Sequence, residues 1–97
     1  MAIEEHLNRV KQGVDVWNKW RENNPNEVPD LSQADIRGYK LQKINLINAN
    51  LKETKLQYAN LYQANLEKAD LSKAKLLETN LQSAKLKNAN LSGAGLL

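Results

Sequence analysis

The chain has 97 residues, of which 41% are hydrophobic and 26% charged, and its formal net charge is +3. This length allows one domain, and the absence of cysteine excludes disulfides and thiolate chemistry. No apolar run is long enough to span a membrane, and the first residues do not resemble a signal peptide, so we expect a cytoplasmic protein without a membrane partner.

Residues 1–28 predict one amphipathic helix followed by a linker. Asn24 precedes Pro25 and should end the helix, because a residue before proline is biased away from helical angles. The apolar side chains recur at helical spacing and form one stripe, which Val16 and Trp20 widen. The stripe itself consists of Ile3, Leu7, Val10, Val14 and Trp17.

Residues 29–97 repeat every five residues. The unit is a small residue, Asn or Asp, an aliphatic residue and two polar residues. A helix cannot use this period, because a step of five residues rotates the side chain by about 500° and spreads the leucines around the helix. The aliphatic residues of the unit are Leu31, Ile36, Leu41, Leu46, Leu51, Leu56, Leu61, Leu66, Leu71, Leu76, Leu81, Leu86, Leu91 and Leu96.

The unit predicts a short strand followed by a corner. Alternation turns the small residue and the aliphatic residue inward and the Asn or Asp between them outward. Asn and Asp suit this position because their side chains bond to nearby backbone. The two polar residues then turn the chain, so that successive units wind into coils that stack and bury the leucines.

This pattern resembles the pentapeptide-repeat family. The resemblance covers residues 29–97 and implies an all-β solenoid, a right-handed quadrilateral β-helix of about three to three and a half coils with four units in each. On this grouping residues 34–53, 54–73 and 74–93 form three coils, flanked by 29–33 and 94–97. We expect the N-terminal helix to cap the first coil.

The cap would protect exposed leucines and strand edges at the open end of the first coil. Tyr39 and Ile44 stand where the repeat has a small residue, and we expect them to face the cap. A helix that binds a partner is the alternative. The residues predicted to form the cap are Leu7, Val10, Val14, Trp17 and Trp20.

No residue pattern predicts catalysis, a metal site or a cofactor. His6 is the only histidine and is expected to lie on the surface at the start of the helix. Asp30 and Asp70 share a face but are separated by Asn50, so no carboxylate pair forms for acid–base chemistry. We therefore interpret the chain as a non-enzyme.

Three functions remain open. A structural or protein-interaction module with an unknown partner is favoured. The resemblance also suggests inhibition of DNA gyrase by DNA mimicry, but ten basic and six acidic residues give the repeats a net charge of +4, the wrong sign. Weak nucleic-acid binding has little support, because acidic residues are interspersed and only Tyr58 and Tyr62 could stack on bases. Its candidate residues are Lys68, Lys73, Lys75, Lys85 and Lys87.

The last residues, LSGAGLL, continue the repeat without a cap. An uncapped coil offers apolar surface and unpaired strand edges, which favour association. We expect a weak homodimer through the C-terminal coils, with Leu96 and Leu97 at its interface. The alternative is that another repeat segment follows and continues the stack.

Overall fold

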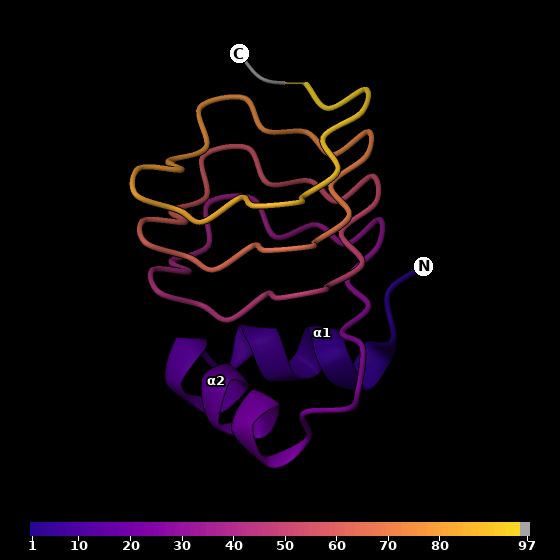
Figure 1. Ribbon diagram of the computed structural model, residues 1–97, viewed down its shortest axis with the longest axis vertical. Helices are drawn as coiled ribbons and strands as arrows, with labels where there is room; N and C mark the ends of the chain where they lie inside the picture. The colour runs from indigo at the N-terminus through magenta and orange to yellow at the C-terminus, as the bar shows by residue number, and fades with distance from the viewer. Residues whose placement is uncertain (96–97) are drawn as a thin grey trace.

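The computed structural model describes residues 1–95. Two helices, α1 (Glu4–Lys11) and α2 (Val14–Asn23), lie at one end of the molecule. The remaining chain winds in stacked coils that lead away from the helices, with the last described coil at the far end (Figure 1). Neither helix is long and apolar enough to cross a membrane among the residues described. Leu96 and Leu97, predicted for the core and the dimer interface, lie outside the described residues.

The prediction of one continuous N-terminal helix was wrong. The chain breaks at Gly13, whose φ of 107° and ψ of 165° are accessible to glycine and costly for other residues. The break redirects the chain, so that α1 and α2 each turn one face toward the first coil. Val16 lies on the opposite face of α2 and is 43% exposed, which also corrects its assignment to the apolar stripe.

Parallel β-bridges join residues that are twenty positions apart, so each coil contains four five-residue units. Each unit contributes one isolated bridged residue, and no longer strand occurs in residues 1–95. The bridges form four ladders. The first ladder is 30, 50, 70 and 90; the second is 35, 55, 75 and 95; the third is 40, 60 and 80; the fourth is 45, 65 and 85.

Each corner is a tight turn between units. In the first corner, the Ala34 N–H donates a hydrogen bond to the Leu31 carbonyl at 3.1 Å. The second residue after each inward aliphatic residue has a φ between 54° and 73°, which is the signature of a type II turn. Eleven of these thirteen residues are not glycine. The burial of the leucines and the bonds between coils must therefore offset unfavourable backbone angles at most corners.

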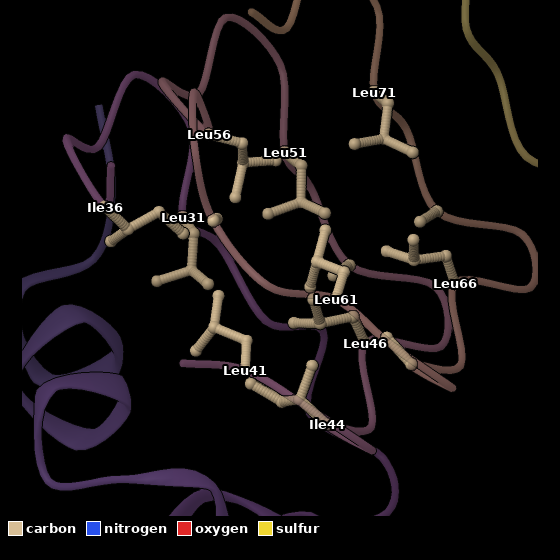
Figure 2. Packing of buried hydrophobic residues seen from close by; sticks show 14 of the residues in the cluster. Leu31, Ile36, Leu41, Ile44, Leu46, Leu51, Leu56, Leu61, Leu66 and Leu71 are labelled. Carbon is tan, nitrogen blue, oxygen red and sulfur yellow. The ribbon is translucent and has the colours of Figure 1, made fainter. Parts of the chain in front are cut away.

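The core is a column of leucines lined by small residues. Side chains from successive coils meet along the axis (Figure 2). Ile44 is fully buried near the helices, whereas Tyr39 packs at the margin of the core. The inward aliphatic residues with exposures of 4% or less are Leu31, Ile36, Leu41, Leu46, Leu51, Leu56, Leu61, Leu66, Leu71 and Leu76.

Candidate interaction surfaces at the ends and sides of the coils

Neighbouring coils are joined by a repeating exchange of backbone hydrogen bonds. The N–H of Leu31 donates to the Asn50 carbonyl at 2.9 Å, and the Asn50 N–H donates back to the Pro29 carbonyl at 2.8 Å. The first coil has no coil before it. Its ladder residues therefore need other partners, because buried backbone groups without partners destabilise the fold.

The N-terminal segment supplies these partners at the first and fourth ladders. The Ile3 N–H donates to the Asp30 carbonyl at 3.0 Å. Trp17 Nε1 donates to the Asn45 carbonyl at 2.7 Å, and the Asn45 N–H donates to Asn18 Oδ1 at 2.8 Å. The cap thus imitates the hydrogen bonds of a missing coil, partly with side chains.

Arg21 also contributes to the cap, and the sequence analysis did not predict this role. Its Nη1 donates to the Asn45 carbonyl at 3.1 Å and its Nη2 to the Ile47 carbonyl at 2.8 Å. The side chain is 8% exposed, and desolvation lowers the pKa of Arg21. It forms no ion pair within residues 1–95. A planar fork of donors matches the two carbonyls better than an ammonium would.

His6 is buried, contrary to the prediction that it is solvated. Its ring packs against Trp20 at 4.8 Å between centroids, and the Asp30 N–H donates to Nδ1 at 2.9 Å. The neutral ring must therefore carry its proton on Nε2, which lies 4.0 Å from Glu27 Oε1. Only the fold could reveal this role, because Asp30 is 24 residues away in sequence.

This contact predicts a loss of stability at mildly acidic pH. Desolvation lowers the pKa of His6 below 6.5; Arg9 acts in the same direction, while Glu27, Asp30 and Glu5 oppose it. The unfolded chain then binds a proton that the folded chain resists, so the free energy of unfolding should fall as pH drops below 6.5. Urea unfolding at about pH 7.5 and about pH 5.5 measures the difference.

His6→Asn is the control for this prediction. Asparagine keeps an acceptor oxygen for the Asp30 N–H but does not titrate. Its stability should change less than that of the wild type over the same interval. An equal change in both proteins would show that other groups cause the pH dependence.

The cap does not pair with the second and third ladders at the helical end of the stack. Residues 1–29 make no hydrogen bond to the backbone of Asp35 or Lys40. A hollow of about 610 Å³ lies between α1 and residues 32–35, and another of about 410 Å³ lies between the start of α2 and residues 40–43. Among the residues described, these edges therefore retain unpaired backbone groups on two of the four sides.

The last described coil is open at the other end of the molecule. Leu81, Leu86 and Leu91 are only partly buried, unlike the leucines beneath them. Their N–H groups have no acceptor within residues 1–95. This end therefore combines apolar surface with unpaired backbone donors.

Asparagine and aspartate close the outer surface of the corners. In each of the nine units that have one, Oδ1 accepts the N–H two residues later, at distances from 2.9 to 3.3 Å. The Asn and Asp side chains thus form hydrogen bonds within their own turns. Lysine replaces them at positions 40, 55, 75 and 85 and leaves the corresponding N–H without this acceptor.

Charges on the sides form separate groups. Arg37 Nη2 lies 2.7 Å from Asp35 Oδ2, and its side-chain hydrogen bonds lower the pKa of Asp35 to about 2. Lys55, the bridged neighbour of Asp35 on the next coil, contributes least to this shift in pKa. The candidate nucleic-acid residues divide between the second ladder with its preceding corner (73 and 75) and the fourth ladder with its following corner (68, 85 and 87).

A family model for pentapeptide repeats matches residues 30–67 and 64–94 with eight copies of the repeat. This chain belongs to the pentapeptide-repeat family. The family predicted from the five-residue period is thereby confirmed. No curated protein matches the chain.

Two solved pentapeptide-repeat proteins are similar to this one. The first, from the cyanobacterium Cyanothece 51142, is 33% identical over 70% of this chain and 44% of its own, with a TM-score of 0.44. The second, from the Arabidopsis thaliana thylakoid lumen, is 29% identical over 70% of this chain and 54% of its own, with a TM-score of 0.41. This pentapeptide-repeat chain thus spans about half the length of these relatives.

The structure brings the predicted cap residues of this pentapeptide-repeat protein to one end. Val10 and Trp17 are buried, and Leu7, Val14 and Trp20 pack against the core. Within residues 1–95, no three histidine, aspartate or glutamate side chains converge to hold a metal ion. The candidate interaction surfaces are therefore the two ends of the stack and the second ladder, where Lys55 and Lys75 replace Asn or Asp.

Proposed function

We propose that this protein is a non-enzymatic, cytoplasmic protein-interaction module built on a right-handed quadrilateral β-helix. The observed bridges and four-unit coils support this architecture, and membership of the pentapeptide-repeat family supports a solenoid module rather than an enzyme. A short solenoid offers flat sides for side-chain display and two ends for association.

The observation that carries the proposal is the contrast between the two ends. The cap satisfies backbone groups of the first coil, whereas Leu81, Leu86 and Leu91 at the other end are half-buried, with N–H groups that find no acceptor among residues 1–95. We propose that a second copy covers this end in a two-fold dimer. The area of one coil is small, so association should be weak.

Sedimentation over a wide concentration range tests this association, with Leu91→Lys as the disrupting variant. The lysine stem can remain at the open end with its ammonium in water, so folding should survive while pairing is lost. We expect concentration-dependent dimers of the wild type and monomers of the variant.

Gln82→Lys is the matched control. It adds the same charge to the same coil at an exposed position and should dimerise like the wild type. A wild type that stays monomeric at high concentration, or a Leu91→Lys variant that dimerises equally well, would refute the proposed interface.

Gyrase inhibition by DNA mimicry is not favoured, because the repeats carry a net charge of +4 from ten basic and six acidic residues. Nucleic-acid binding is not favoured either, because the candidate lysines divide between two sides of the stack and do not follow one track. A gyrase supercoiling assay provides a direct test of the first alternative.

A further inference from the structure

The second ladder differs from the others in its chemistry. Lys55 and Lys75 are bridged neighbours on this ladder, and both stand where the repeat has Asn or Asp. This is the one place among residues 30–95 where two such substitutions are stacked. Like charges on adjacent layers repel one another, so the pair does not stabilise the coils by itself.

The substitutions leave two backbone donors free on the same side. The N–H groups of Gln57 and Leu77, each two residues after a lysine, have no acceptor within residues 1–95. In the nine Asn- and Asp-containing corners, the equivalent N–H is closed by an outward side chain, so these two N–H groups also point outward. They lie one layer apart, about 4.8 Å.

Such a pair of donors suits one carboxylate. Its two oxygens can accept from both N–H groups and thereby replace the missing Asn or Asp oxygens. The ammonium groups of Lys55 and Lys75 form no ion pair in residues 1–95, whereas Arg37 is occupied by Asp35. The charges of Lys55 and Lys75, with Asp35 on the layer beyond Lys55, therefore complement a negatively charged ligand placed between the two lysines.

The same side also carries exposed apolar surface. Tyr58 is 61% exposed and Leu77 is 45% exposed, and they are the two large hydrophobic residues of 30–95 with such exposure. They are adjacent, because the Tyr58 N–H donates to the Leu77 carbonyl at 3.1 Å. A hollow of about 520 Å³ lies beside Tyr58 and is lined by Arg37, Gly38, Tyr39 and the carboxylate residue Asp35, which Arg37 pairs.

We propose that the second ladder binds an acidic segment of a partner protein. A Glu or Asp carboxylate of the partner accepts from the N–H groups of Gln57 and Leu77 between the two lysines. An apolar side chain next to that carboxylate packs on Tyr58 and Leu77. The apolar part distinguishes such a segment from a nucleic-acid backbone. This inference rests on the proposed interaction function and names the partner's chemistry.

An NMR titration of the full chain tests this site, with the blocked peptide Leu-Glu-Leu-Glu-Leu as the probe. We expect the amide signals of Gln57 and Leu77 to shift most, and the corresponding Leu-Gln-Leu-Gln-Leu peptide to leave them unchanged. The double variant Lys55→Asn/Lys75→Asn supplies internal oxygens for both N–H groups. It should bind the acidic probe at least about tenfold more weakly and melt at the same temperature as the wild type or higher.

Lys40→Asn/Lys85→Asn is the matched control, since it makes the same two substitutions on other ladders. It should bind the probe like the wild type. If both double variants bound the acidic probe equally weakly, the loss of affinity would come from net charge alone, and the proposal would be overturned. Unshifted Gln57 and Leu77 signals, or tighter binding of an oligothymidylate at these signals, would also overturn it. None of these outcomes affects the dimerisation test, which uses neither ladder lysine.

Discussion

Leu66→Asp is expected to unfold the protein. Leu66 is fully buried in the leucine column, with coils above and below it. An aspartate there would bury a charge without a partner or force the coil open, at a cost of more than about 4 kcal/mol. A domain of this size has a total stability of only about 5–15 kcal/mol. Circular dichroism during heating measures the loss.

Lys68→Asp is the control for the leucine column. Lys68 lies two residues further along the same unit and is exposed, with a φ of 62° that aspartate tolerates better than most residues. Its melting temperature should remain close to that of the wild type, since surface substitutions change stability by about 0.5 kcal/mol or less. Equal melting temperatures for the two variants would contradict the inward placement of the leucines.

Trp17→Ala is expected to have the second-largest effect. Trp17 is completely buried between α2 and the first coil, and its Nε1 donates to the Asn45 carbonyl. Alanine leaves a cavity and removes that donor, so the free energy of unfolding should fall by about 3–5 kcal/mol. Urea unfolding measures the change. The intact protein should show the blue-shifted fluorescence of a buried tryptophan.

Two further variants separate packing from hydrogen bonding at this position. Trp17→Phe keeps most of the apolar contact but loses the donor, while Arg21 Nη1 still reaches the Asn45 carbonyl. We expect a loss of about 1 kcal/mol. Val16→Ala changes an exposed residue of the same helix and should be nearly silent. A Trp17→Ala variant as stable as Val16→Ala would mean that the helices do not cap the coils.

The leucine column and the cap differ in how much of each could be predicted from the sequence. The leucine column could be predicted because the five-residue period is repeated along most of the chain. Each unit has its aliphatic residue at the same inward position. The hydrogen bonds of the Asn and Asp side chains were equally predictable, because each acts within its own turn. Local chemistry repeated many times leaves few alternatives.

The cap could be predicted only in outline. Its apolar residues indicated a helix that packs on the coils. The chain forms two helices instead, because it breaks at Gly13 although the apolar stripe continues through this position. Trp20 and the other apolar cap residues were found by periodicity. The polar contacts of His6, Asn18 and Arg21 were not, because nothing near them in sequence distinguishes them from surface residues.

The sequence by itself determined the repeat, its inward leucines and the closure of its corners, because these depend on residues within one five-residue unit. The stacking of Lys55 and Lys75 also followed, from the four-unit coil that the family resemblance implies, and the bridges confirm it. Only the tertiary structure decided the capping contacts. His6 meets Asp30, 24 residues away, and Arg21 meets Ile47, 26 residues away. Such contacts depend on how the chain winds and on where Gly13 redirects it, and those distances are set by the whole fold.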